Sequence, residues 1–249
     1  MVAAVKLHRH VGRKRAGRFL AEGPNLVEAA LRRGFVSEVF ATEAAFARFG
    51  ALLAGAPVML VTERAAKALS DTVTPVGLVA VCTLPEVALP AVLAAGPRLL
   101  AVAVGMSEPG NAGTLIRTAD AMGADAVVFT GDSVDPYNGK CLRSSAGSAF
   151  SVPVVAGAEV SDAAAVISAI RDSGVQILAT ALDAAVDITS VDLAVPTAWL
   201  FGPEAQGLPP DIADLASQPV TIPMRGSAES LNVAAAAAIC LYESARAQS

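Results

Sequence analysis

The second half of this sequence alternates short apolar runs with helix-like segments, and this alternation restricts the fold most. The run Leu99–Val104 has no polar residue, which is typical of a strand buried on both faces of a parallel sheet. We predict further strands at Ala126–Thr130, Val152–Val155, Val175–Ala179, Thr197–Phe201 and Pro219–Ile222. We predict helices at Ala112–Met122, Asn138–Ala146, Asp162–Ser173, Pro209–Leu215 and Leu231–Arg246. The pattern predicts an α/β fold, a parallel sheet with helices on both faces.

The first half predicts a smaller α/β unit. Its expected elements are helices at Pro24–Arg33 and Glu43–Leu53 and strands at Val36–Ala41, Val58–Val61 and Val76–Cys82. A stretch rich in Pro and Ala follows and is the best linker candidate. The chain of 249 residues is long enough for two modest domains. We therefore divide it into a domain at 1–84, a linker at 85–97 and a domain at 98–249.

Charge is distributed unevenly along the chain, although the net charge is only −5. Residues 1–33 carry eight Lys and Arg against two Glu, a local net charge of +6, and the remainder carries −11. Such a basic cluster attracts phosphate backbones through counterion release. The alternative is a solvated, disordered basic tail. The candidate contacts to RNA or another polyanion in this segment are Arg9, Arg13, Lys14, Arg15 and Arg18.

Several other classes of protein are disfavoured. The longest apolar stretch, Val87 to Gly105, is interrupted by two prolines and an arginine, so we expect no membrane span. The basic start leads to no apolar segment of the kind found in signal peptides. The sequence has no G-x-G-x-x-G after the first strand of the second half and no Walker A motif, which disfavours an ordinary nucleotide site.

The cysteines and histidines point to neither disulfides nor a metal. Three widely spaced cysteines fit neither a disulfide framework nor a zinc site, and two histidines near the start lack partners at metal-ligand spacing. We expect a reducing, cytoplasmic compartment. The apolar fraction of 54% and charged fraction of 16% leave few charges to cover a surface, which favours an oligomer.

Three loops that join a strand to a helix could carry chemistry. The first contains Asn111, which could cap the following helix or bind a ligand, and leads to Arg117. Arg117 could pair with Glu108 or Asp120, or it could face the cleft and hold a phosphate with its planar guanidinium. The second loop places Glu204 between two glycines at a strand end, where it could bond a ligand or cap a helix.

The third loop contains Ser230 and Asn232, both natural caps for the last helix. Capping needs only one of them, which leaves the other for chemistry. The basic, hydroxyl-rich segment around Arg143 could bind a phosphate, with an ordinary surface helix as the alternative.

In this order, the three loops resemble the three motifs of the SpoU (TrmH-type) family of RNA 2'-O-ribose methyltransferases, within the SPOUT superfamily. The most specific part is Ile222-Pro223-Met224 followed by Glu229-Ser230-Leu231-Asn232-Val233. The segment from Arg18 to Gly23 resembles the start of the L30e-like substrate-binding domain that often precedes this catalytic domain. Two departures are Glu108, where the family commonly has Asp, and Pro203, where it has Asn or Ser.

The resemblance implies a trefoil knot near the C-terminus, a homodimer, and S-adenosylmethionine as the cofactor. It implies no metal. The implied cofactor contacts are Thr180, Gly202, Ile222, Met224 and Leu231. The implied catalytic residues are Asn111, Arg117, Glu204, Ser230 and Asn232, and Arg143 would hold an RNA phosphate.

The sequence therefore predicts a cytoplasmic, homodimeric RNA ribose 2'-O-methyltransferase. Ribosomal RNA is the favoured substrate, and transfer RNA is the other possibility. One alternative is a non-catalytic RNA-binding or ribosome-assembly protein that retains the fold. Another is an α/β enzyme that acts on a small molecule, which the basic N-terminal segment disfavours.

Overall fold

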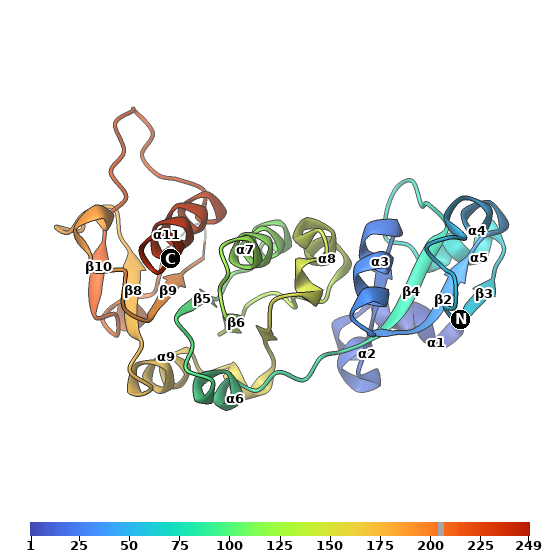
Figure 1. Cartoon of the computed structure of the whole chain (residues 1–249), viewed down its shortest axis with the longest axis horizontal. Helices are drawn as coiled ribbons and strands as arrows, with labels where there is room; N and C mark the ends of the chain where they lie inside the picture. Colours follow the sequence, from blue (N-terminus) through green and yellow to red (C-terminus); the bar gives the residue numbers. More distant parts are fainter. Residues whose placement is uncertain (204–206) are drawn as a thin grey trace. The chain divides into compact units, whose positions relative to one another are not determined.

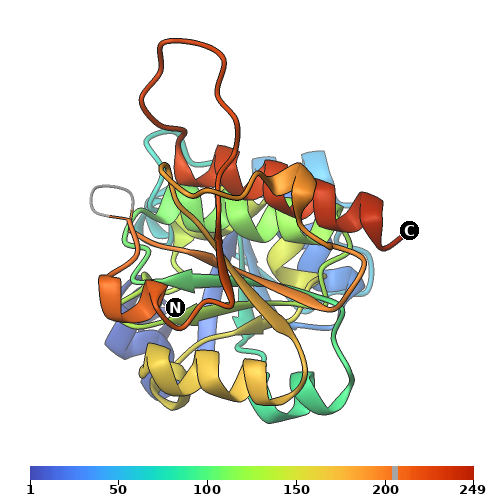
Figure 2. The same ribbon diagram turned by 90° about the vertical axis from the view of Figure 1, so that its left-hand side faces the viewer.

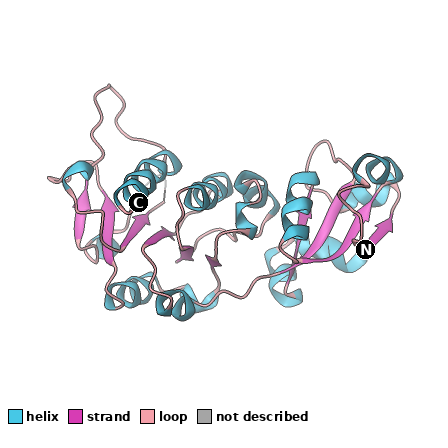
Figure 3. Ribbon diagram, viewed as in Figure 1, coloured by secondary structure: helices cyan, strands magenta, loops and turns pink. Residues whose placement is uncertain are grey.

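The computed structural model describes residues 1–203 and 207–249. These residues form two compact units. One unit contains residues 1–86 and 137–151, and the other contains residues 87–136 and 152–249. Figure 3 shows that each unit combines strands with helices. The segment 137–151 therefore packs with the first unit, although the sequence assigned it to the second domain.

The sheet of the second unit is entirely parallel among the described residues. Its strands are β5 (Leu99–Val104), β6 (Ala126–Thr130), β7 (Val154–Val155), β8 (Gln176–Thr180), β9 (Thr197–Phe201) and β10 (Gln218–Val220). They lie in the order β10-β8-β9-β5-β6-β7, and each neighbouring pair is parallel. The predicted parallel sheet is confirmed, and β5, β6 and β9 have the predicted bounds.

Helices cover both faces of this sheet, as predicted. Helices α7 (Pro109–Ala121) and α11 (Val233–Ala247) lie side by side on one face, and α6 (Leu89–Ala94) and α9 (Ala163–Asp172) lie on the other (Figure 2). The face covered by α9 also receives α10 (Pro210–Ala213) through Ile212. On the opposite face, the buried Trp199 of β9 donates its indole N–H to Ser244 Oγ of α11 at 2.8 Å. Short 3-10 turns at Ala158–Val160 and Ile188–Ser190 complete the unit.

The stretch expected to be a linker, 85–97, contains helix α6 (Figure 1). Leu89 at the start of this helix is only 7% exposed and packs into the core of the second unit with residues of α9 and β5. Pro90 lies in the first turn, where a missing backbone N–H costs no helical hydrogen bond. The Pro-rich composition therefore marks a helix start here.

The first unit contains a four-stranded mixed sheet. Its strands are β1 (Arg18–Glu22), β2 (Val36–Ala41), β3 (Val58–Leu60) and β4 (Leu78–Thr83), in the order β1-β4-β2-β3. Strand β4 is antiparallel to both β1 and β2, and β3 is parallel to β2. Its helices include α3 (Pro24–Arg32), α4 (Glu43–Phe49) and α5 (Glu63–Ala68). Strand β1 and helix α5 were not predicted from the sequence.

The basic N-terminal segment is folded, in contrast to the alternative of a disordered tail. It forms α1 (Val2–Val5), a 3-10 turn at Lys6–His8 and α2 (His10–Ala16). Ala4 and Leu7 are buried against a core cluster that includes Leu20 and Phe40 of the sheet. The segment 137–151 contributes α8 (Gly139–Ser145) and a 3-10 turn at Ser148–Phe150 to the same unit.

The three cysteines are free and buried. Burial raises the pKa of Cys82 to about 12, and burial also raises the pKa of Cys240. Both thiols therefore stay neutral at physiological pH, and they are poor nucleophiles. In residues 1–203 and 207–249, no helix has the length and hydropathy required to cross a bilayer.

Candidate active site

A pocket of about 530 Å³ opens at the carboxyl ends of three strands of the second unit. Thr180 ends β8, Gly202 follows β9, and Thr221 follows β10. Ligands of open parallel sheets bind at this edge, and the volume is within the usual range for small-molecule sites. The lining residues are Thr180, Ala181, Leu182, Gly202, Pro203, Gly207, Leu208, Thr221, Ile222, Met224, Ser230, Leu231, Asn232, Val233 and Ala236.

All five residues expected to contact the cofactor line this one pocket: Thr180, Gly202, Ile222, Met224 and Leu231. They come from three loops that are separated by up to 51 positions in the sequence, so the fold has brought them together. Ser230 and Asn232 line the same pocket. Figure 2 shows the loop between β10 and α11, which carries most of these residues, extending beyond the layer formed by α7 and α11.

Sequence reasoning missed Leu182 as a pocket residue. It lies two positions after Thr180 and is 62% exposed, although it is a large apolar side chain. An exposed leucine beside a pocket supplies apolar surface for a ligand. Its sequence neighbourhood gave no signal, because exposure becomes visible only in the folded chain.

Gly202 makes a very close approach to the loop that returns from it. A β-carbon added at this position would lie 2.6 Å from the carbonyl carbon of Gly207 and 2.6 Å from the backbone N of Leu208. Those atoms belong to the backbone and cannot move aside cheaply. The sequence signal of a glycine at a strand end thus corresponds to a position where no side chain fits.

The first and second loops meet at Gly105 and Pro203. Gly105 follows β5 and has φ +61°, a left-handed conformation that favours glycine. A β-carbon at Gly105 would lie 3.4 Å from Cγ of Pro203. Proline at this position lacks a backbone N–H to donate to a ligand. The departure from the family pattern therefore places an apolar ring beside the end of β5.

The first and third loops are joined by a hydrogen bond between two asparagines. Asn232 Nδ2 donates to Asn111 Oδ1 at 3.2 Å, while Asn232 Oδ1 accepts from the backbone N–H of Ala234 at 2.9 Å. Of the two predicted candidates, Asn232 is therefore the cap of α11. Ser230 is not used for capping and lines the pocket.

The alternative interpretation of Asn111 as the cap of α7 is wrong. Helix α7 begins at Pro109, and its cap is Glu108, which accepts from the backbone N–H of Gly110 at 3.2 Å. Asn111 lies inside the first turn because proline is well suited to the first helical position. Its side chain is thus available to Asn232 rather than to the helix end.

Arg117 is exposed on α7 and does not line the pocket. Within the part of the chain that the structure describes, it forms no hydrogen bond or ion pair, so neither Glu108 nor Asp120 holds it as a structural arginine would be held. Glu204, the remaining expected catalytic residue, lies outside the described residues.

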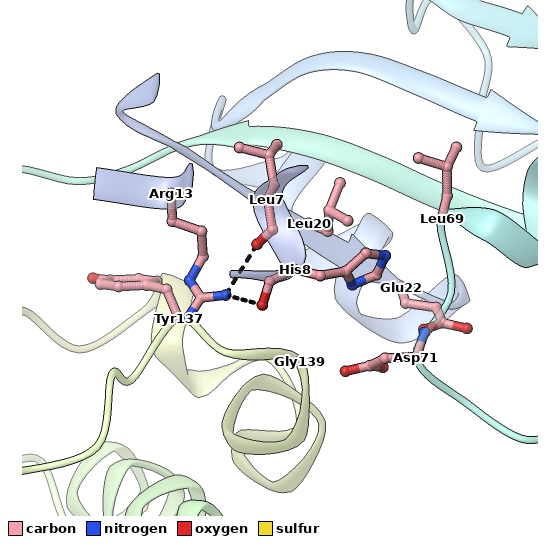
Figure 4. Close-up of a pocket in the computed structure, with 9 residues that line it drawn as sticks. All are labelled: Leu7, His8, Arg13, Leu20, Glu22, Leu69, Asp71, Tyr137 and Gly139. Carbon is pink, nitrogen blue, oxygen red and sulfur yellow. Dashed lines mark hydrogen bonds between the residues drawn. The ribbon is translucent and has the colours of Figure 1, made fainter. Parts of the chain in front are cut away.

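Four of the expected RNA contacts are exposed residues of the first unit: Arg9, Lys14, Arg15 and Arg18. Arg13 is different, because it is only 5% exposed and donates to the backbone oxygens of Leu7 and His8, both at 2.9 Å (Figure 4). Its guanidinium satisfies carbonyls at the end of a short helix. The expectation that Arg13 contacts RNA is therefore corrected to a structural role.

Arg143 also belongs to the first unit, on α8. Its guanidinium forms ion pairs with Asp71 and, at 3.9 Å, with Glu22. Seven of the expected residues thus line the pocket, and Asn111 is hydrogen-bonded to one of them. Arg117 lies outside the pocket on α7, and the exposed basic residues belong to the first unit.

Two protein families match this chain. Residues 98–242 match the SpoU rRNA Methylase family, and residues 3–80 match the MRM3-like substrate binding domain. The 23S rRNA (guanosine(2553)-2'-O)-methyltransferase RlmP of Bacillus subtilis is 35% identical over 238 residues, which cover 95% of this chain and 92% of that protein.

Solved structures resemble the chain over nearly its whole length. The AdoMet-bound rRNA methyltransferase from Sinorhizobium meliloti has a TM-score of 0.84 at 29% identity, covering 98% of this chain and 93% of that one. The SpoU methyltransferase AviRb from Streptomyces viridochromogenes has a TM-score of 0.83 at 31% identity, covering 98% and 95%.

Proposed function

This chain belongs to the SpoU rRNA methylase family, and we propose that it transfers the methyl group of S-adenosylmethionine to a ribose 2'-hydroxyl of 23S rRNA. The observation that carries this proposal is the pocket at the ends of β8, β9 and β10, where all five expected cofactor contacts converge. The relative from Bacillus subtilis is named for the same reaction on 23S rRNA, which favours ribosomal over transfer RNA.

The pocket suits S-adenosylmethionine in size and chemistry. Its volume of about 530 Å³ can hold a small molecule, and Ile222 and Leu231 supply apolar walls beside the hydroxyls of Thr180 and Ser230. Gly202 allows the backbone of Gly207 and Leu208 to pack closely against the strand end, where both glycines and Leu208 line the pocket. When bound, S-adenosylmethionine supplies a methyl group on a sulfonium leaving group, so the proposed transfer requires no metal.

The protein must lower the cost of deprotonating a weakly acidic ribose hydroxyl. We assign Arg117 to stabilise the developing negative charge or to hold the adjacent phosphate, because its exposed guanidinium has no internal partner among the described residues. A role as general base is disfavoured, since guanidinium keeps its proton at all relevant pH. Asn232 orients Asn111 through their hydrogen bond, and Ser230 positions the ribose. Glu204 retains the proposed role of orienting Arg117 or Asn111.

The family membership extends the proposal to architecture and location. We include a C-terminal trefoil knot formed by the loops of the pocket, and a homodimer, which the low charged fraction of 16% supports. We place the protein in the cytoplasm, the compartment of its proposed substrate. We propose the first unit as an L30e-like RNA-binding domain and the second unit as the knotted methyltransferase domain, and the family matches at 3–80 and 98–242 support this division.

The function is tested by incubating the full chain with methyl-labelled S-adenosylmethionine and unmodified transcripts of 23S rRNA or transfer RNA. We expect label on one ribose of 23S rRNA, located by nuclease digestion and mass spectrometry. Label on transfer RNA alone would show that transfer RNA, and not 23S rRNA, is the substrate. Cofactor binding without label on either RNA would contradict the proposed reaction, and absence of cofactor binding would favour the non-catalytic RNA-binding alternative.

The role of the basic segment is tested with matched charge changes. The double variant Lys14→Gln/Arg15→Gln should weaken binding to 23S rRNA and reduce the slope of log Kd against log salt by about 1.5, because two phosphate contacts are lost. The control is Arg64→Gln/Lys67→Gln, which removes two exposed cations of α5 in the same unit. If both double variants lost RNA affinity equally, the effect would come from overall charge and not from contacts of Lys14 and Arg15.

Deleting residues 1–33 would be a poor test of the same role. The deletion removes β1 and α3, and with them the buried side chains of Phe19 and Val27. Loss of RNA binding would then follow from loss of the unit's core. Substitutions of exposed side chains avoid this ambiguity.

A further inference from the structure

Arg143 lies between two carboxylates of the first unit that differ strongly in their surroundings. Its guanidinium pairs with Asp71 and lies 3.9 Å from Glu22, and its side chain is 35% exposed. The Glu22 side chain is only 10% exposed and accepts hydrogen bonds from Ser70, from Thr72 at 2.7 Å and from the backbone N–H of Asp71 at 3.3 Å. Glu22 is thus a fixed, satisfied part of the unit.

Asp71 is the exchangeable partner. Its side chain is 41% exposed, and its carboxylate lies against the start of α8, beside Gly139 (Figure 4). Ion pairs between exposed side chains contribute little to stability because water and salt compete for both partners. The Asp71–Arg143 pair is therefore a contact that a stronger anion can replace.

Helix α8 does not depend on this ion pair for its position. Cys141, Leu142 and Ser145 on α8 are buried. At the ends of the same segment, the rings of Tyr137 and Phe150 lie 5.0 Å and 5.9 Å from the ring of Phe19. Aromatic contacts and burial hold the segment, so removing the Asp71 charge should leave Arg143 in place.

We propose that Asp71 is an autoinhibitory partner of Arg143 that occupies the guanidinium until an RNA phosphate displaces it. The proposal rests on the RNA-methyltransferase function above. A phosphate can form two parallel hydrogen bonds with a guanidinium, which makes it a strong competitor for this site. The nearby Asp71 carboxylate repels phosphates that do not engage Arg143 fully. The pair therefore opposes loose contacts and favours RNA that presents a phosphate in the correct place.

The proposal is tested by measuring Kd for unmodified 23S rRNA with the full chain and its variants across a series of KCl concentrations. Asp71→Asn should tighten binding about two- to fivefold, the strength expected of a surface ion pair. The slope of log Kd against log salt should change little, because the same phosphate contacts Arg143 in the RNA-bound state of both proteins. Glu43→Gln removes another exposed carboxylate of the same unit and should change neither quantity.

A second variant separates contact from charge. A β-carbon at Gly139 would lie 3.0 Å from Cγ of Asp71 and 3.1 Å from Nη1 of Arg143, so Gly139→Ala should displace the carboxylate without changing net charge. Its effect should follow that of Asp71→Asn. Both effects should vanish when Arg143 is replaced by Gln. This dependence distinguishes displacement at Arg143 from any structural role of Asp71.

Three results would overturn the proposal. Asp71→Asn could tighten binding equally with and without Arg143, which would reduce the effect to overall charge. It could weaken binding, which would make Asp71 a support for Arg143. Or no form of the protein could bind the transcript. These binding measurements need no S-adenosylmethionine, so a failure of methyl transfer would overturn the proposed function separately.

Discussion

Replacing Arg117 by alanine is expected to lower the rate of methyl transfer by about a thousandfold, the size of effect seen when one group that stabilises developing charge is removed. Arg117 is exposed on α7 and has no partner among the described residues that its loss would leave unsatisfied. It does not line the pocket, so the dissociation constant for S-adenosylmethionine should stay within about twofold. Single-turnover transfer of labelled methyl to 23S rRNA, together with calorimetric titration of the cofactor, measures both quantities.

Two further variants show whether the effect belongs to this guanidinium. Arg117→Lys keeps the charge but loses the planar set of donors, and it should recover only a small part of the lost rate. Arg171→Ala removes an exposed arginine of α9, on the opposite face of the sheet, and should leave the rate unchanged. Normal turnover by Arg117→Ala would show that Arg117 takes no part in the reaction. Loss of cofactor binding would make it a structural residue of the pocket.

The elements predicted most accurately are those whose residues are buried on both faces. Strands β5, β6 and β9 have the predicted bounds because their sequences are apolar apart from one terminal threonine in β6 and one in β9. Strand β1 was missed because it is short and its ends are charged residues, Arg18 and Glu22. Helix α1 was missed because it is only 4 residues long, and α2 was missed because its basic composition is also that of a disordered tail. What stabilises them is tertiary burial of residues such as Leu7, which local sequence does not reveal.

The candidate site was predictable where backbone geometry demands particular residues. Gly202 is required by close backbone approach, and a glycine between a strand and a helix signals this from sequence alone. The roles of individual polar side chains were harder to predict, because they depend on where a helix starts. Asn111 follows the cap of α7, while Asn232 is the cap of α11, although both positions looked similar in sequence.

The pairings of the arginines depend on contacts between distant segments. Arg13 and Arg143 have ordinary surface sequences, yet one is buried against backbone carbonyls and the other is paired with acids more than 70 positions away. No periodicity encodes such pairs. The sequence therefore predicted correctly that basic residues cluster along the chain. It did not predict which of these residues are exposed on the surface.

The second large effect is expected for Gly202→Ala, which should raise the dissociation constant for S-adenosylmethionine by more than about a hundredfold. A β-carbon here would lie 2.6 Å from backbone atoms of Gly207 and Leu208, so the loop must move and the pocket wall moves with it. Overpacking of this kind costs about 1–3 kcal/mol of folding stability. Calorimetric titration measures the affinity, and thermal unfolding measures the stability.

Gly226→Ala is the matched control for this substitution. Gly226 lies in the loop between β10 and α11, where a β-carbon would meet nothing within 4 Å, so cofactor affinity should be unchanged. Binding of 23S rRNA should persist in Gly202→Ala, because the basic residues proposed for RNA belong to the other unit. Retained RNA binding then shows that the loss is local to the pocket. Unchanged cofactor affinity in Gly202→Ala would mean that S-adenosylmethionine binds elsewhere, and the proposed site would have to be abandoned.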